Sequence, residues 1–459
     1  MNRKEFIKKS MISLGISPFL FSSNPFGSLH ASEEEESITL PSKVKSVIFI
    51  EMMGGMSHVD TLDPKPNSAF GKVSSSISGL SVLEPFSLTA KQLHSIGIIR
   101  STWSEEGDHG FAQMLLGTGY RMTEAMGFPD IPHFGAVIAY AKKSKVKSSY
   151  FPSYVTIGGR GGKNGNSGFL GIDYSGYHVG NVDEPIQHLN PSYGKFAEDR
   201  ILRRKDLVSF MNEEFSKTYP TKESKHWKNM LVAAEEFRNS KNIDSFRISL
   251  EDEKTRARYG TTWQGKAMLL AKRLAAQEVP FIHISIGGWD THTGNKAQVT
   301  KNMKETDMGI ASLLEDLNNT GLIKQTLFVL TSEFGRTPDV GSRDGRDHHP
   351  KVWSTLLGGG PFTKGFVLGE TDETGSKPVN PKEALHVRDL IATIYQAAGV
   401  NPDGSLTNSF GRPFLLTTKK AKVYEGLFLV FLRFINTKIA VCQNRIKRSG
   451  FVAWIQIGF

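Results

Sequence analysis

Short apolar runs alternate with amphipathic stretches along this chain, and glycine and polar residues follow each apolar run. The runs at residues 46–52, 281–286 and 326–331 have the length and composition of buried β-strands. Apolar residues recur with helical spacing over residues 262–274 and 299–318, on either side of the second run. This alternation of strand and helix predicts right-handed crossovers and a mostly parallel sheet.

The remaining pattern extends the α/β arrangement over most of the chain. No linker divides the sequence cleanly, so we predict one large domain with insertions. The glycine-rich stretch 158–168 lacks P-loop spacing, which favours a surface loop over a phosphate cradle. Further strands are predicted at 94–100, 154–157 and 365–369. A further helix is predicted to open within residues 105–110 and to run through Leu116, and others are predicted at 132–143, 198–217, 224–240 and 389–398.

Acidic and imidazole side chains follow two of the predicted central strands. Asp290 and His292 come after the run at 281–286, and on an extended segment their side chains point the same way. Because parallel strands end at one edge of a sheet, such residues can converge on one metal ion. Oxygen and nitrogen ligands without thiolate suit zinc, manganese or magnesium. The candidate ligands are Asp290, His292, Glu333 and His348, with Asp347 and His349 as groups that orient ligands or move protons.

This cluster has an alternative interpretation, in which the same residues are hydrogen-bonded loop positions around a pocket without metal. Arg336 and Arg346 are candidate clamps for an anionic substrate, because guanidinium groups match phosphate oxygens bidentately. Pairing with nearby carboxylates, such as Asp339 or Asp344, accounts for the two arginines equally well.

No hydroxyl is marked clearly as a nucleophile. Ser57 follows the glycine turn after the first strand, where serine serves more often as a helix N-cap. Ser101 and Thr102 are further candidates near the second strand. Asp108 and His109 open a predicted helix, whose first amides can hold an anion or can simply complement an acidic side chain.

The net charge of +10 is concentrated at the two ends of the chain. Residues 1–31 carry +3 and residues 429–459 carry +5, which leaves +2 for the body and gives no reason to expect nucleic-acid binding. The first segment resembles a twin-arginine signal peptide with Lys4 at the second arginine position, and a disordered or amphipathic helix is the alternative. The basic, apolar tail suits weak membrane contact or an aberrant extension. The single cysteine, Cys442, excludes an intrachain disulfide.

Several motifs in order resemble the domain-of-unknown-function 1501 family, a bacterial exported group that is described as sulfatase-like. The first of them reads Met-Gly-Gly-Met-Ser-His-Val-Asp-Thr-Leu-Asp-Pro over residues 53–64. The similarity extends to about residue 428 and leaves the tail outside. The matching stretches are residues 49–66, 168–172, 258–260, 270–279, 287–292, 333–338, 345–348 and 358–372.

The resemblance implies the alkaline phosphatase superfamily, and therefore a three-layer α/β/α sandwich with a central, mostly parallel sheet. The loop from Asp290 is similar to the metal loop of cofactor-independent phosphoglycerate mutases, and His348 resembles their later metal-binding histidine. Glu51 stands at the position of their first-strand aspartate, so it joins the candidate ligands. Phe334 stands where those enzymes have a histidine ligand, which argues against a complete two-metal centre.

Together these features predict a metal-dependent hydrolase of phosphate or sulfate esters, exported to the periplasm or cell envelope of a bacterium. The expected cofactor is a divalent zinc, manganese, magnesium or calcium ion, and the expected substrate is a small anionic ester or a glycan-derived one. The alternative is an exported binding protein without catalysis, on a degenerate scaffold of the same fold. Residues 32–428 would form the folded domain in either case.

Overall fold

A computed structural model describes residues 38–125, 130–142, 151–159, 166–186, 197–219, 234 and 236–429. The chain divides into two compact units. The described part of the smaller unit, which comprises Met1–Glu34 and Ser192–Val232, is the helix α5 (Ala197–Thr218). The larger unit comprises Glu35–Pro191 and Ala233–Phe459 and contains every other element named below.

A nine-stranded sheet forms the centre of the larger unit, in the order β12-β4-β11-β8-β1-β7-β5-β6, with β13 paired to β4. β1 lies between β7 and β8 and pairs with both in parallel register. β11 runs antiparallel to its two neighbours, β4 and β8. The strands are β1 (Ser46–Met52), β4 (Ile96–Trp103), β5 (Tyr154–Gly158), β6 (Tyr177–Val179), β7 (Phe281–Ile286), β8 (Thr326–Thr331), β11 (Trp353–Gly359), β12 (Val367–Leu368) and β13 (Leu385–His386).

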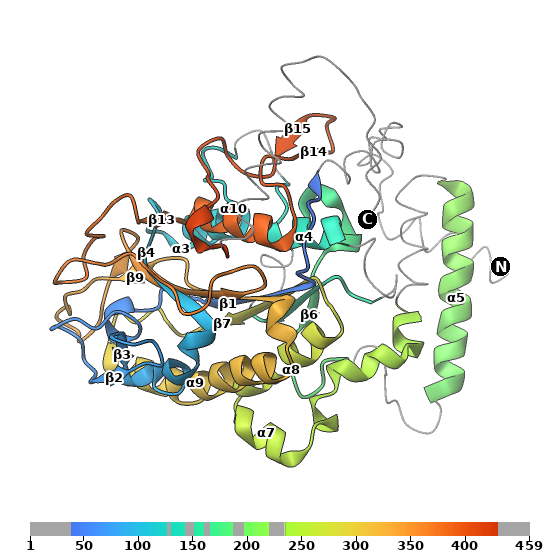
Figure 1. Cartoon of the computed structure of the whole chain (residues 1–459). Coiled ribbons are helices and arrows are strands. Elements are labelled where there is room, and N and C mark those ends of the chain that lie inside the picture. The colour runs from blue at the N-terminus through green and yellow to red at the C-terminus, as the bar shows by residue number, and fades with distance from the viewer. Residues whose placement is uncertain are drawn as a thin grey trace, which may run out of the picture. The chain divides into compact units, whose positions relative to one another are not determined.

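Helices cover both faces of this sheet (Figure 1). One face packs against α3 (His109–Thr118), α4 (Phe134–Lys142) and α10 (Val387–Ala398). The other packs against α8 (Trp263–Ala276) and α9 (Asn295–Asn319), with α7 (Glu253–Tyr259) beside them. All seven residues of β1 are buried, because its successive side chains enter opposite cores.

Smaller antiparallel pairs complete the larger unit. The pair β9 (Gly335–Arg336) and β10 (His348–His349) joins two of the predicted site segments directly. The other pairs are β2 (Lys72–Ser74) with β3 (Ser81–Leu83) and β14 (Ser405–Thr407) with β15 (Pro413–Leu415). Short 3₁₀ helices include η2 (His58–Asp60) after β1 and η4 (Thr89–Ser95) before β4.

The predicted three-layer sandwich with a mostly parallel sheet is confirmed. The antiparallel strand β11 was not anticipated, because a buried apolar run carries no information on strand direction. The predicted leader, nearly all of the tail, most of the glycine-rich loop and most of the helix expected at 224–240 lie outside the described residues. None of the described helices combines the length and apolar character needed to cross a membrane.

Candidate metal centre

The site forms at the edge of the sheet where the parallel strands β1, β7 and β8 end. Gly54 follows β1 with a φ of +113°, and a Cβ added there would overlap the backbone nitrogen of Asp290. Gly288 follows β7 and has a φ of +98°. These conformations are accessible to glycine at no steric cost. The β1 loop can therefore lie directly against the loop that carries Asp290.

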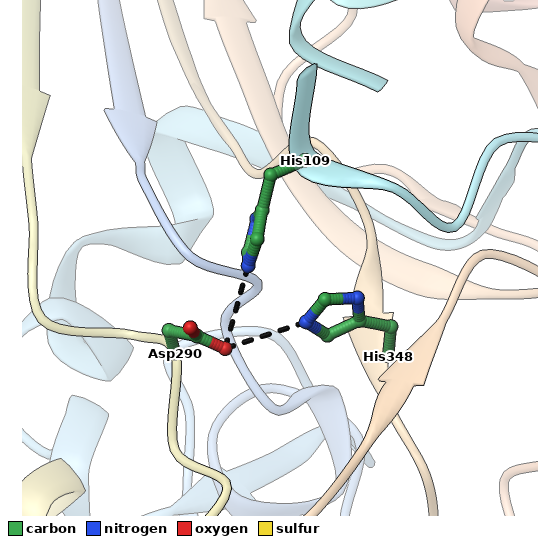
Figure 2. Close-up of side chains that lie close together, drawn as sticks. All are labelled: His109, Asp290 and His348. Carbon is green, nitrogen blue, oxygen red and sulfur yellow. Dashed lines mark hydrogen bonds and ion pairs between the residues drawn. The ribbon is translucent and has the colours of Figure 1, made fainter. Parts of the chain in front are cut away.

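Three imidazoles and one carboxylate converge at this edge. The Nε2 atoms of His292, His348 and His109 lie 3.1, 3.3 and 3.4 Å from Oδ1 of Asp290. Figure 2 shows His109, at the start of α3, and His348, on β10, both pointing at this oxygen. The ligand atoms of His109, Asp290 and His348 all lie within 4.8 Å of one another. His292 extends the group, with its Nε2 atom 3.1 Å from that of His348.

The other ring nitrogen of each histidine contacts an acceptor that orients the ring. Nδ1 of His109 lies 2.9 Å from Glu333, and Nδ1 of His292 lies 2.8 Å from Asp347. Nδ1 of His348 lies 2.7 Å from the carbonyl oxygen of Gly107. A carboxylate or carbonyl accepts a proton from Nδ1, so the neutral ring presents the lone pair of Nε2. All three lone pairs then face one region, as in histidine metal sites with supporting acceptors.

Hydrogen bonds alone cannot satisfy this arrangement. Oδ1 of Asp290 already accepts a hydrogen bond from Nη2 of Arg336 at 2.5 Å, while three imidazole nitrogens compete for its remaining lone pair. The facing nitrogens of His292 and His348 can share only one proton. The three imidazole nitrogens lie 3.1–3.4 Å from Oδ1 of Asp290, close to the spacing of about 3.3 Å between neighbouring ligands of one zinc ion. The cluster therefore fits a cation at its centre.

The charges of the site favour an ionised carboxylate. Partial burial opposes ionisation of Asp290, but the Arg336 hydrogen bond and charge, followed by the charge of His109, lower the pKa of Asp290 to about 2. The hydrogen bond to Glu333 is the main reason that the pKa of His109 is raised. Burial lowers the pKa of His348 and favours its neutral form, which is the form that binds metal. In the absence of a cation, a proton on His109 would partly fill the same electrostatic role.

The two arginines predicted as anion clamps are completely buried. Arg336 donates to the carbonyl groups of Gly54, Gly55 and Arg346 as well as to Asp290. These contacts tie together the loops after β1, β7 and β8. In this arrangement Arg336 orients a candidate metal ligand, and its donors are already engaged.

Arg346 forms a second buried network behind the site. It forms a bidentate ion pair with Asp60, and both side chains are fully buried. Its remaining donors contact the carbonyl groups of Asn67, Thr337 and Pro338. Asp60 also accepts hydrogen bonds from the side chain of Asn295 and from the Ala69 amide. The predicted pairing of Arg346 with Asp339 or Asp344 is absent from the described contacts, and Asp60 takes that place.

Glu51 is buried, and its Oε2 lies 3.0 Å from Nε2 of His283. His349 contacts the Ser376 carbonyl through Nε2 at 2.8 Å and stacks on His58. The hydroxyl of Ser57 donates to Asp60 at 2.7 Å and is almost fully buried. His349 and Ser57 therefore belong to local networks beside the Asp290 cluster, and Glu51 pairs with His283.

Residues 290, 292, 333, 347 and 348 are brought together as the sequence predicted. Their functional roles remain predictions. Glu333 contacts Nδ1 of His109 and accepts a hydrogen bond from the Gly54 amide. It therefore orients the imidazole whose Nε2 atom faces Asp290. Asp347, whose side chain is 80% exposed, supports His292 in the same way.

His109 is the cluster member that sequence reasoning did not propose as a ligand. It stood out only as part of an Asp-His pair at a predicted helix start. Oδ1 of Asp108 accepts hydrogen bonds from the Gly110 and Phe111 amides, so the acidic N-cap occupies the donors that were considered for an anion. Packing of His109 against Phe334, with ring centroids 4.9 Å apart, further fixes the imidazole.

The model of a family described as "Protein of unknown function (DUF1501)" matches residues 44–428, so the chain belongs to this family. The search of curated proteins gives no match. Solved structures similar to this chain include the lipoteichoic acid synthase LtaP from Listeria monocytogenes, at 7% identity and a TM-score of 0.36, covering 85% of this chain and 80% of that one. The sulfatase PsFucS1 from Pseudoalteromonas sp. gives 12% identity, a TM-score of 0.37 and coverages of 81% and 72%. An alkaline phosphatase from the Antarctic bacterium TAB5 gives 11% identity, a TM-score of 0.33 and coverages of 70% and 92%.

Proposed function

We propose that this member of the DUF1501 family is an exported, metal-dependent hydrolase of phosphate or sulfate esters. The observation that carries the proposal is the convergence of three imidazole Nε2 atoms on one carboxylate oxygen. Each imidazole has an acceptor behind it, so the side chains are held in place before a ligand binds. Because the side chains are already ordered, little conformational entropy is lost when a ligand binds, and such preorganisation is typical of a functional centre.

We assign Asp290, His292, His348 and His109 as the metal ligands. Arg336 holds Asp290 in position, while Glu333 and Asp347 orient two of the imidazoles. Three nitrogen donors and one oxygen donor favour zinc or manganese over magnesium or calcium, which prefer oxygen. A metal ion held by these residues, with a further coordination position open to solvent, would lower the pKa of a water molecule bound there and would neutralise charge on a phosphoryl or sulfuryl group.

Part of the cluster is accessible to solvent. The side chains of Asp290, His292 and Asp347 are 50%, 40% and 80% exposed. A small anionic ester, free or carried on a glycan, can therefore approach from solvent. Since Arg336 and Arg346 are buried and engaged, recognition of the anion rests on the metal ion in this proposal. Export is proposed from the leader-like composition of residues 1–31.

The experiment that tests the proposal measures metal content and ester hydrolysis in the full-length protein, purified without chelator. We expect close to one equivalent of zinc or manganese. Hydrolysis of para-nitrophenyl phosphate or sulfate should disappear on chelation and return when the metal is restored. The substitutions Asp290→Asn and His109→Ala should each remove the metal while the far-ultraviolet circular dichroism spectrum stays unchanged.

A matched control is His94→Ala, because His94 is an exposed histidine whose ring contacts Ser76 and the Lys91 carbonyl. It should keep both metal and activity. A wild-type protein that binds no added metal by calorimetry contradicts the assignment of the ligands. That result would favour the alternative function, an exported binding protein with the same fold and no catalysis.

A further inference from the structure

We infer that Glu105 is a positioning residue of the metal centre, because the start of α10 holds its carboxylate and thereby fixes the backbone that leads to His109. This inference rests on the proposed function, and it identifies a side chain outside the cluster that sets the affinity of the cluster for metal. Glu105 lies four residues before His109, in the connection between β4 and α3.

This connection, residues 104–108, supplies two parts of the site. The carbonyl oxygen of Gly107 lies 2.7 Å from Nδ1 of His348 and orients that imidazole. His109 follows the connection as the first residue of α3 and directs Nε2 toward Asp290. The path of this backbone therefore decides where two of the four assigned ligands lie.

Contacts at both ends and in the middle hold the connection in place. At one end the Ser104 amide donates to the Pro350 carbonyl at 2.9 Å, and at the other end Asp108 caps α3. Between these ends, the carboxylates of Glu105 and Glu106 pair with basic groups of other segments. These two side chains anchor the middle of a segment that belongs to no helix or strand.

Two residues at the start of α10 contact the Glu105 carboxylate. Nε2 of His386 lies 2.6 Å from Oε2 of Glu105, and Nη2 of Arg388 lies 3.1 Å from Oε1. The side chains of both partners are buried. Each oxygen of the carboxylate therefore has its own buried basic partner, which restricts how the side chain can rotate.

The imidazole of His386 is itself fixed from its other side. Its Nδ1 accepts a hydrogen bond from the Arg388 amide at 3.0 Å and so caps α10. Because Nδ1 accepts, the neutral ring carries its proton on Nε2 and donates it to Glu105. Partial burial opposes ionisation of Glu105, but this hydrogen bond is the main reason that the pKa of Glu105 is lowered.

The start of α10 is a firm support for this contact. α3 and α10 lie together on one face of the sheet (Figure 1), and β13, immediately before α10, pairs with β4. The ring of Trp103, at the end of β4, packs edge-on against His386 with centroids 4.7 Å apart. The contact between Glu105 and His386 therefore joins the connection to elements that the core already holds.

The same contacts could stabilise the fold and leave the metal centre unaffected. The position of Gly107 argues against this alternative, because its carbonyl is two residues from Glu105 and is also the acceptor behind His348. A displaced Glu105 side chain lets this backbone shift, so that His348 and His109 both lose part of their orientation. Loss of a group that orients metal ligands typically lowers metal affinity by about 10–100-fold.

The test measures zinc affinity of the full-length protein by chelator competition, in the variants Glu105→Gln and His386→Asn. Glutamine keeps the size of the side chain and removes its charge, whereas asparagine keeps an N-cap for α10 and is too short to reach Glu105. Each variant should bind zinc about tenfold more weakly than the wild type. The visible spectrum of bound cobalt(II), recorded at saturating metal, should also change, because it reports the geometry of the ligands.

Glu251→Gln is the matched control. Glu251 forms a comparable ion pair with Arg273 of α8, on the other face of the sheet, at 2.5 Å. Its side chain is 17% exposed, compared with 28% for Glu105. The control should lower the free energy of unfolding, while its zinc affinity stays within about twofold of the wild type and its cobalt spectrum is unchanged. A tenfold loss of zinc affinity in this control as well would assign the effect to general destabilisation and overturn the inference.

The double variant Glu105→Gln/His386→Asn tests whether the two residues act through one contact. We expect its loss of zinc affinity to be smaller than the product of the two single losses, because a shared contact is removed only once. Losses that multiply show that His386 acts independently of Glu105, and they overturn the inference. Zinc affinity within about twofold of the wild type in both single variants also overturns it and leaves the proposed function standing. If the wild-type protein binds no added metal, the ligand assignment and this inference fail together.

Discussion

Substitution of Arg346 by lysine tests whether this guanidinium stabilises the protein or binds the substrate. Its three nitrogens make five contacts, with both Asp60 oxygens and with the carbonyl groups of Asn67, Thr337 and Pro338. A lysine ammonium offers three donors, so at least two of these five contacts are lost. An unsatisfied buried polar group costs about 1–3 kcal/mol, so we expect the free energy of unfolding to fall by about 3 kcal/mol.

Urea unfolding followed by circular dichroism measures that change, and steady-state hydrolysis of a para-nitrophenyl ester measures KM in parallel. For Arg346→Lys we expect the lower stability with KM within about twofold of the wild type, since the side chain is fully buried. Arg343→Lys is the matched control, because Arg343 is exposed in the same loop and should change stability by less than about 0.5 kcal/mol. A tenfold rise in KM without loss of stability would refute this reasoning and restore the anion-clamp interpretation.

Three further perturbations address the loops and the buried histidine. An alanine at Gly345 would place its Cβ against the His292 carbonyl, so we expect Gly345→Ala to lower metal affinity at least about tenfold in chelator competition. Glu333→Gln should also weaken metal binding, by about 10–100-fold, because it removes the carboxylate that orients His109; unchanged affinity would show that Glu333 has no such role. His58 is fully buried, and burial lowers its pKa from 6.5 to about 4. Well above pH 6.5, His58 is neutral in the folded and in the unfolded protein, so it does not make stability depend on pH. Between pH 6.5 and about 4, the unfolded chain binds a proton at His58 and the folded protein does not, which stabilises the unfolded state. The free energy of unfolding should therefore fall by up to about 3 kcal/mol as the pH drops through this window, and His58→Gln should flatten that part of the urea-derived pH profile.

The fold was predictable because its central strands are buried on both faces. β1 alternates between two cores, so apolar residues fill most of its positions on both faces, and β7 and β8 share this property. The direction of β11 was not predictable, since it depends on the path of the chain between β9 and β11 and not on the composition of the strand. Sequence pattern therefore identified the layers and the central strands, and left the edge of the sheet undetermined.

The site was only partly predictable, and the reason lies in what each residue contacts. Asp290 and His292 follow the central strand β7, so their place at this edge of the sheet follows from parallel topology. His348 lies on β10, which pairs antiparallel with β9, the strand that follows β8 along the chain. His109 follows β4, which lies on the opposite side of β1 from β7 in the sheet. No sequence motif links it to Asp290. Its place is set by three-dimensional contacts, with Glu333 on Nδ1 and the Phe334 ring against the imidazole.

Arg336 and Arg346 were predicted to bind an anion, but the structure buries both side chains. A guanidinium beside candidate metal ligands predicts anion binding by residue chemistry, but burial decides whether its donors face solvent or backbone carbonyl groups. Arg336 and Arg346 donate hydrogen bonds to backbone carbonyl groups in the loops. These bonds satisfy buried carbonyls outside regular helices and strands, so the loops can keep an irregular backbone at a buried edge of the sheet. A site built this way keeps its positive charge inside the protein, where Arg336 positions Asp290. Under the proposed function, a metal ion would then be the group that contacts an anionic substrate.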